Sequence, residues 1–295
     1  MTSENIARAA RSRLLVGDGA MGTQLIERGL EAGECPELWN IERRSDVLEI
    51  QRSYREAGAD LLITNTFGGT RWKLDGFHLG DRVGEISSAA VEIAREAGGE
   101  DCFVLGDIGP TGRFVAPLGT DPREAFVEVF AEQAGALVAA GADAVILETF
   151  TALDELLAAL EAARATNLPV VASMSYERRR EGVFHTMMGA DLPGSTQALV
   201  EAGADVICGN CGTGPSDYVE IARDLCAATD LPVMIEPNAG APRLEGGRQV
   251  FPMGPEEMAG YAGDLLAAGV RILGGCCGTG PEHIREIRKA VDRLA

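Results

Sequence analysis

Lysine is almost absent from this sequence of 295 residues, which contains only Lys73 and Lys289. Lysine and arginine together number 26 against 45 aspartate and glutamate residues, so the formal net charge is −19. This charge argues against nucleic acid and anionic membranes as partners, because both are bound by a surplus of basic side chains. It also argues against a Schiff-base lyase or aldolase, since Lys73 lies in an expected loop and Lys289 in the last expected helix.

Long apolar runs are lacking as well. No run reaches the roughly 18 residues that would span a bilayer, and the N-terminus contains no apolar stretch of signal-peptide length. We therefore expect a cytoplasmic protein without a membrane partner. Hydrophobic residues make up 46% of the sequence, which is ordinary globular composition.

Histidine is scarce, and none of the three histidines lies at the end of an expected strand, so a serine or cysteine hydrolase would lack its usual base. The sequence contains seven cysteines, which is an odd number, and we expect no leader segment. Both points argue against a disulfide framework. We expect reduced thiols. Cys102, Cys208 and Cys226 have apolar or helical neighbours typical of small core residues, and Cys35 has no assignable role.

Short apolar runs alternate with Ala-rich amphipathic runs from end to end. The apolar runs predict eight strands: Leu14–Val16, Leu61–Thr64, Phe103–Leu105, Ala144–Leu147, Val170–Ser173, Val206–Cys208, Val233–Ile235 and Ile272–Leu273. The amphipathic runs predict helices over Ser45–Ala57, Arg82–Ala97, Pro122–Ala140, Leu153–Ala165, Ser216–Ala227, Pro255–Ala268 and Pro281–Leu294. Strands separated by helices pair in parallel, and eight such units in about 250 residues are typical of a TIM barrel. We predict a single (β/α)8 barrel domain over residues 1–295.

A doubly wound sheet is the alternative fold. Gly17–Gly22 matches the spacing of the dinucleotide-binding G-x-G-x-x-G motif. No helix of normal length and second strand follow within the ~30-residue unit that the motif requires, so we expect no dinucleotide site.

An internal repeat supports the barrel. Four glycines stand between an expected helix and an expected strand, where a positive φ ends a helix: Gly58, Gly141, Gly203 and Gly269. Seven residues after them come polar or reactive residues, in order Asn65, Glu148, Asn210 and Cys276. The same offset therefore places a functional group at four strand ends.

Three cysteines lie at the ends of the sixth and eighth expected strands. In a barrel these ends face one mouth, so Cys211 would meet Cys276 and Cys277. Three thiolates with an open fourth position are the pattern of a catalytic zinc site. The glycines of Gly274–Gly278 remove side-chain bulk around the last two sulfurs. Asn238 follows the neighbouring seventh strand, and its amide oxygen or a water molecule could occupy the fourth position.

These strand ends resemble the zinc-dependent homocysteine S-methyltransferase family from about Leu14 to Arg293. The motifs that carry the resemblance are Gly17–Thr23, Thr64–Phe67, Gly106–Gly112, Glu148–Phe150, Gly209–Cys211, Glu236–Gly240 and Gly274–Thr279. Within the family, the likeness is strongest to the N-terminal homocysteine-binding module of cobalamin-dependent methionine synthase. The resemblance implies a TIM barrel, one Zn²⁺ per chain on Cys211, Cys276 and Cys277, and methyl transfer to homocysteine with methionine as product.

The resemblance also implies how homocysteine is held. Asp18 and Glu148 would bind its ammonium group, and the Gly19–Ala20 turn with Thr23 would lie near its carboxylate. For Asn65 and Asp107, substrate contact and a purely structural hydrogen-bonding role both remain open.

Several alternatives stay open on the sequence. The 295 residues contain no folate or cobalamin module, so we expect a methylcorrinoid on a separate protein as donor, or else S-methylmethionine or S-adenosylmethionine. Selenocysteine or another thiol could replace homocysteine as acceptor. A different class of function is a subunit that binds homocysteine or zinc without turnover. The segment Arg178–Gly189 with Met187 and Met188 could line the donor side of the mouth or belong to the core.

Overall fold

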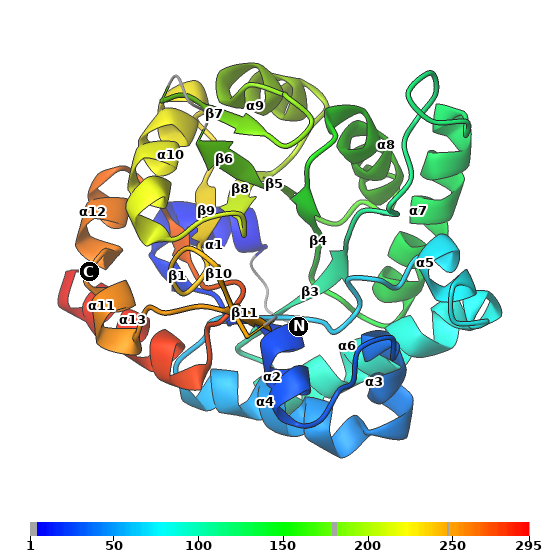
Figure 1. The fold of residues 1–295 in the computed structure, drawn as a ribbon, viewed down its shortest axis with the longest axis horizontal. Helices are drawn as coiled ribbons and strands as arrows, with labels where there is room; N and C mark the ends of the chain where they lie inside the picture. Colours follow the sequence, from blue (N-terminus) through cyan, green and yellow to red (C-terminus); the bar gives the residue numbers. More distant parts are fainter. Residues whose placement is uncertain (1–4, 179–181, 247, 295) are drawn as a thin grey trace.

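The computed structural model describes residues 5–178, 182–246 and 248–294, and it confirms the predicted (β/α)8 architecture. Eight parallel strands form one sheet in the order β1-β12-β9-β8-β5-β4-β3-β2. Helices surround this sheet on its outer side (Figure 1). The strands are β1 (Leu15–Val16), β2 (Leu61–Ile63), β3 (Phe103–Ile108), β4 (Ala144–Phe150), β5 (Val170–Met174), β8 (Val206–Asn210), β9 (Val233–Glu236) and β12 (Ile272–Leu273). Each overlaps a strand predicted from the sequence.

The outer layer consists mainly of the predicted amphipathic helices. They are α4 (Arg44–Glu56), α6 (Val83–Gly98), α7 (Arg123–Ala139), α8 (Leu153–Arg164), α10 (Pro215–Ala228), α11 (Pro255–Ala259), α12 (Ala262–Ala267) and α13 (Pro281–Leu294). The expected helix over Pro255–Ala268 is divided into α11 and α12 at Gly260 and Tyr261. No helix of the described residues is both long and apolar enough to cross a membrane.

Two carboxylates join β1 to β2, where the sheet order begins and ends. Asp60 accepts a hydrogen bond from the Val16 amide at 2.8 Å and donates its own amide to the Val16 carbonyl at 2.7 Å. Asp18 accepts from the Ile63 amide at 2.8 Å. These bonds satisfy strand groups that lack a regular ladder partner, so the barrel is nearly closed.

The repeated helix–glycine–strand joints have the backbone expected of them. Gly58, Gly141, Gly203 and Gly269 adopt φ values of 105°, 97°, 93° and 109°. A side chain in this region would be strained, so glycine ends each helix and turns the chain into the following strand.

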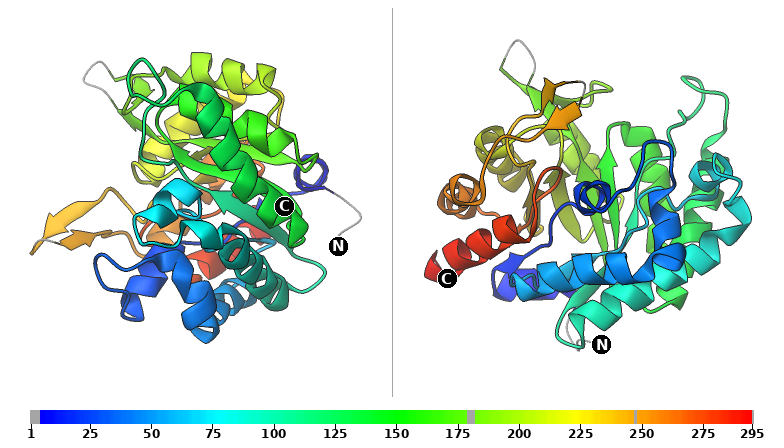
Figure 2. Two further views of the ribbon diagram at one scale, coloured as in Figure 1. Left: turned by 90° about the vertical axis from the view of Figure 1, so that its right-hand side faces the viewer. Right: turned by 60° about the horizontal axis from the view of Figure 1, so that its bottom comes forward.

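The barrel interior is filled at one end and hollow at the other. Alternate strand residues such as Phe103, Ile146 and Met234 form a buried cluster that includes Ile6 and Ala9 of α1 (Ile6–Ser12). Helix α1 therefore covers the amino ends of the strands. In the left view of Figure 2, α1 and a projecting hairpin of β10 (Arg243–Glu245) and β11 (Arg248–Val250) lie on opposite sides of the molecule.

Several elements were not predicted. They are α1, α2 (Met21–Glu27), α3 (Trp39–Glu42), α5 (Arg71–Asp75), α9 (Leu192–Glu201), the short turns Pro36–Leu38 and Gly80–Arg82, and the hairpins β10–β11 and β6–β7. The last hairpin, β6 (Tyr176–Arg178) and β7 (Phe184–Thr186), occupies the Met-rich segment, of which residues 179–181 lie outside the described part. Met187 and Met188 are 62% and 40% exposed, so they do not belong to the core.

Candidate active site at the carboxyl ends of the strands

A cavity of about 400 Å³ opens at the carboxyl ends of the barrel strands. Nine residues predicted as site residues contribute to its wall: Gly19, Ala20, Thr23, Asn65, Asp107, Glu148, Cys211, Cys276 and Cys277. The other two, Asp18 and Asn238, are buried beside this wall. The wall also includes Glu236, which ends β9. The shared register of parallel strands therefore brings together groups that are more than 250 residues apart in the chain.

The three cysteines form one cluster, with all three sulfur atoms within 4.8 Å of one another. The Sγ atom of Cys277 lies 3.8 Å from that of Cys211 and 4.0 Å from that of Cys276. Tetrahedral zinc with Zn–S bonds of about 2.3 Å separates its sulfur ligands by about 3.8 Å. The donor set and its spacing thus fit a soft, tetrahedrally coordinated metal ion.

The three thiols affect one another's pKa values, and this bears on how they would bind a metal ion. Hydrogen bonds from the Cys276 and Cys277 thiols lower the pKa of Cys211 to about 3, whereas proximity to the Cys211 thiolate raises the pKa of Cys276. Only one sulfur can therefore become anionic easily while the others supply protons. A metal cation would replace those protons and favour the thiolate form of all three.

Asn210, the last residue of β8, connects the cysteines to the acidic side of the cavity. Its Nδ2 atom lies 2.9 Å from Glu148 Oε1 and 3.7 Å from Cys276 Sγ. Its Oδ1 atom accepts from the Ser173 hydroxyl at 2.6 Å and the Thr149 amide at 3.1 Å. These contacts orient the amide so that its donor side faces both functional groups. The repeat offset had singled out Asn210, but no site role was predicted for it.

The backbone is strained at two of these strand ends. Thr149 and Cys211 have φ values of 58°, the left-handed region that residues with a Cβ atom rarely adopt. Thr149 immediately follows Glu148, and Cys211 immediately follows Asn210. The strained residues therefore turn the chain where the functional side chains enter the cavity.

Four carboxyl groups form an acid cluster at the cavity: Asp107, Glu148 and Glu236 line it, and Asp18 is buried beside them. Asp18, Asp107 and Glu236 are 2–3% exposed, and Glu148 is half-buried. Asp107 and Glu148 hydrogen-bond to each other. Oδ1 of Asp107 and Oε2 of Glu236 have no protein hydrogen-bond partner among the described residues.

Burial is the main reason why the pKa values of this cluster lie above their usual range. It raises the pKa of Glu148 to about 7, and burial together with the charge of Glu148 raises the pKa values of Asp18, Asp107 and Glu236. Lysine and arginine do not occur among the described residues that line the cavity. A positively charged ligand in the cavity would therefore reduce the mutual repulsion of these carboxylates.

Glycines make room for Glu236, a site residue that was not predicted. A Cβ atom at Gly17 would approach Glu236 Oε1 to 3.3 Å, and one at Gly274 to 2.9 Å. Glu236 begins the Glu236–Gly240 motif, but no site role was predicted for it. Its position one residue before the Pro237-Asn238 pair is the sequence signal that could have identified it.

The segment that joins β1 to α2, together with the first residues of α2, forms another part of the wall and is called here the β1–α2 turn (Asp18–Thr23). The Ala20 amide is occupied by Thr279 Oγ1 at 3.1 Å, and Thr23 Oγ1 accepts from the Gly278 amide at 3.1 Å. Helix α2 starts at Met21 without a side-chain cap. The first amides of a helix have no intrahelical acceptor, so this turn can donate to an anionic group.

The two asparagines differ in their surroundings. Asn65 donates through Nδ2 to the Pro36 carbonyl at 2.8 Å and to Asn40 Oδ1 at 3.1 Å, which ties the segment after α2 to the end of β2. Asn238 hydrogen-bonds to Cys211, and its buried Oδ1 atom has no partner among the described residues. A free oxygen beside a sulfur cluster is an available metal ligand.

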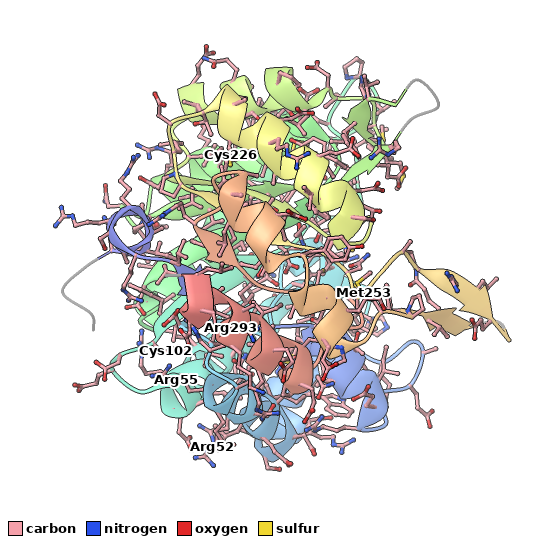
Figure 3. The ribbon with its side chains drawn as sticks, turned by 90° about the vertical axis from the view of Figure 1, so that its left-hand side faces the viewer. Arg52, Arg55, Cys102, Cys226, Met253 and Arg293 are labelled. Atoms are coloured by element: carbon pink, nitrogen blue, oxygen red, sulfur yellow. The ribbon has the colours of Figure 1, made fainter. Side chains whose placement is uncertain are left out.

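The remaining cysteines lie away from the cluster. Cys102 and Cys208 are buried, and burial raises the pKa of Cys102 to about 12. Cys226 lies on α10 in the outer layer of helices, as Figure 3 shows. Cys35 Sγ lies 3.3 Å from Glu37 Oε2, and burial beside this carboxylate raises its pKa to about 12. None of these four has the spacing of a metal ligand set within the described residues.

A (β/α)8 barrel with three converging thiols and buried carboxyl groups at the carboxyl ends of its strands has the arrangement typical of an enzyme active site. The model of the family described as homocysteine S-methyltransferase matches residues 15–291. The chain belongs to this family, as its motifs had indicated.

Comparison with known proteins supports this assignment. The chain is 37% identical over 303 residues to methionine synthase from Mycobacterium leprae, and 38% identical over 304 residues to methionine synthase from Mycobacterium tuberculosis. These alignments cover 95% and 96% of this chain, which spans only about a quarter of the length of either relative (24% and 25%). The metallated form of the homocysteine methyltransferase MmuM from Escherichia coli superposes with a TM-score of 0.79 at 26% identity, covering 97% of this chain and 99% of MmuM.

Proposed function

We propose that this chain transfers a methyl group to the thiol of homocysteine and produces methionine. The observation that carries the proposal is the arrangement within one cavity of three sulfurs no more than 4.8 Å apart and a buried acid cluster. The sulfur cluster suits a thiol bound through a metal, and the acid cluster suits the ammonium group of an amino acid. Homocysteine carries both groups.

We propose Zn²⁺, one per chain, held by Cys211, Cys276 and Cys277. Bound zinc would keep the substrate sulfur deprotonated and nucleophilic at neutral pH. Asn238 would present its unpartnered Oδ1 atom to the fourth position in the absence of substrate. Asn210 would donate an N–H group to Cys276 Sγ and so reduce the charge density on that sulfur.

The remaining site residues would orient the amino-acid end. Glu148, aligned by Asn210, would accept from the ammonium group, with Asp107 and Glu236 adding negative charge beneath it. Asp18 contributes mainly through its charge, because one of its oxygens already accepts from Ile63. The β1–α2 turn with Gly19, Ala20 and Thr23 would lie near the carboxylate, with Ala20 forming part of the wall because its amide already donates to Thr279. Asn65 would support the wall, since its amide nitrogen is used by Pro36 and Asn40.

We propose a methylcorrinoid carried by a separate polypeptide or module as the methyl donor. The similarity to proteins named methionine synthase supports this donor. The alternative is S-methylmethionine or S-adenosylmethionine, which requires no partner polypeptide. Residues 1–295 would serve as the homocysteine-binding domain in either case.

A donor panel tests the proposal. Zinc-loaded chain is incubated with homocysteine and one donor at a time, and methionine is measured by mass spectrometry. The donors are a methylated corrinoid protein, methylcobalamin, S-methylmethionine and S-adenosylmethionine. The Cys276→Ala variant is the matched control. Methionine formation that depends on Cys276 with any donor supports the function, and the most active donor identifies the class. Stoichiometric zinc and homocysteine binding without turnover under every donor, including a methylated corrinoid protein, would instead indicate a binding subunit.

A further inference from the structure

Two segments at opposite ends of the chain form one hydrogen-bonded unit at the cavity wall. They are the β1–α2 turn (Asp18–Thr23) and a segment called here the cysteine loop (Gly274–Thr279). The Gly275 amide donates to the Asp18 carbonyl at 3.0 Å, and the Gly278 amide donates to Thr23 Oγ1 at 3.1 Å. The proposed substrate-carboxylate turn and two proposed metal ligands are thus held by shared contacts.

Thr279 is the central link of this unit. Its side chain is fully buried. Its hydroxyl donates to the Cys276 carbonyl at 2.7 Å and accepts from the Ala20 amide at 3.1 Å. A hydroxyl has one proton to donate and lone pairs that accept, so one side chain completes the hydrogen bonding of both segments.

The packing around Thr279 leaves little room for the two segments to move separately. A Cβ atom at Gly19 would lie 2.8 Å from Thr279 Oγ1, and one at Gly275 would lie 2.7 Å from its Cγ2 atom. Tyr54, buried on α4, adds a second link, because its hydroxyl lies 2.9 Å from the Ala20 carbonyl and 3.3 Å from the Thr279 carbonyl. Close-packed groups of this kind transmit a change in one segment to the other.

We infer that Thr279 is a positioning residue that couples metal binding at the cysteine loop to the order of the β1–α2 turn. The inference rests on the proposed function, in which Cys276 and Cys277 hold the metal and the turn receives the substrate carboxylate. A metal on these cysteines restricts the loop backbone, and the Thr279 hydroxyl passes that restriction to the Ala20 amide. The metal would then prepare the carboxylate site before substrate arrives, beyond its direct contact with the substrate sulfur.

Hydrogen exchange in the absence of substrate tests the coupling. Amide exchange in peptides covering residues 18–24 and 274–280 is measured by mass spectrometry on the full chain with and without zinc, for the wild type, Thr279→Val and Thr279→Ser. Valine has nearly the shape of threonine but lacks the hydroxyl, whereas serine keeps the hydroxyl. Thr196→Val, which removes another buried threonine hydroxyl on α9, is the matched control. Bound zinc is quantified for every variant.

In the wild type, zinc should slow exchange in both peptides, by about tenfold or more for amides that gain a stable hydrogen bond. In Thr279→Val, zinc should still slow exchange in residues 274–280, while its effect on residues 18–24 falls to about twofold or less. Thr279→Ser and Thr196→Val should match the wild type. Kinetically, Thr279→Val should raise the KM for homocysteine with a smaller change in kcat.

Equal slowing in residues 18–24 in the wild type and Thr279→Val would overturn the coupling. The coupling would also be overturned if zinc slowed exchange only in residues 274–280 of the wild type. If that chain still forms methionine, the proposed function stands without the coupling. A wild-type chain that binds no zinc would refute the proposed metal site and the coupling together. If Thr279→Val does not fold, Thr279→Ala, which also lacks the hydroxyl, takes its place. In that variant too the effect of zinc on residues 18–24 must fall while its effect on residues 274–280 remains, or the inference is wrong.

Discussion

Replacing Glu148 by glutamine should stabilise the fold at alkaline pH while it weakens homocysteine binding. Glutamine keeps an oxygen for the Asn210 amide and gives Asp107 an N–H donor in place of a competing carboxyl group. The substitution therefore preserves the hydrogen bonds and removes only the charge. Stability and binding should change in opposite directions, because the same charge is costly without a ligand and favourable beside an ammonium group.

The stability effect follows from the pKa of Glu148. Burial raises it from 4.5 to about 7, so between these pH values the folded chain binds more protons than the unfolded chain. Stability contributed by this group therefore falls as the pH rises through this window. The shift corresponds to about 3 kcal/mol above pH 7, an upper value because the side chain is partly exposed to the cavity. The glutamine variant escapes this loss, so it should match the wild type near pH 4.5 and exceed it at pH 8.

Urea unfolding at the two pH values, with zinc chelated in both proteins, measures the stability difference, and calorimetric titration of the zinc-loaded proteins measures homocysteine affinity. Losing the charged partner of a buried ammonium costs about 2–5 kcal/mol, or roughly 30-fold or more in Kd. Glu155→Gln is the control, since Glu155 is a buried acid that accepts from Thr111 outside the cavity. Unchanged homocysteine affinity in folded Glu148→Gln would refute the ammonium assignment. Equal stability of wild type and variant at pH 8 would refute the electrostatic reasoning.

Three further predictions concern the metal site and its support. Cys276→Ala should remove most bound zinc and nearly all methyl transfer, whereas Cys226→Ala should leave the zinc content unchanged; elemental analysis of both proteins decides this. Zinc-edge X-ray absorption should show three sulfurs and one light atom in the resting protein, with Asn238 as the proposed light-atom ligand, and four sulfurs after homocysteine is added. Four protein sulfurs at rest would contradict an open site. Asn210→Ala leaves buried partners unsatisfied and should destabilise the chain by about 1–3 kcal/mol in urea unfolding, and it should raise the KM for homocysteine. A KM equal to that of the wild type would show that Asn210 does not align Glu148.

The fold could be predicted from the sequence because each unit of the barrel has a recognisable local sequence pattern. Each strand is a short apolar run with buried neighbours on both faces, and each joint carries a glycine such as Gly58 or Gly203 whose positive φ ends a helix. The parallel pairing that these units require places their carboxyl ends at one mouth. The approach of Cys211 to Cys276 and Cys277 could thus be predicted from register alone.

Short or irregular elements were harder to predict. Helices α2 and α9 are only 7 and 10 residues long, and their amphipathic pattern is too brief to distinguish from a loop. The hairpins β6–β7 and β10–β11 are antiparallel pairs of three-residue strands. Such pairs depend on the surrounding structure, because isolated short hairpins are marginally stable in water.

Only the tertiary structure decided how the polar groups share their partners. That Asp18 faces the substrate ammonium stays a prediction, and only the structure shows that one of its oxygens accepts from the Ile63 amide between β1 and β2. Asn210 belongs to the strand-end repeat and Thr279 ends the Gly274–Thr279 motif, but no sequence pattern shows that each joins two segments of the site. Hydrogen bonds and desolvation depend on distances between atoms that are remote in the chain. The residue types at each strand end are therefore determined locally, whereas their charges, orientations and couplings exist only once the barrel has closed.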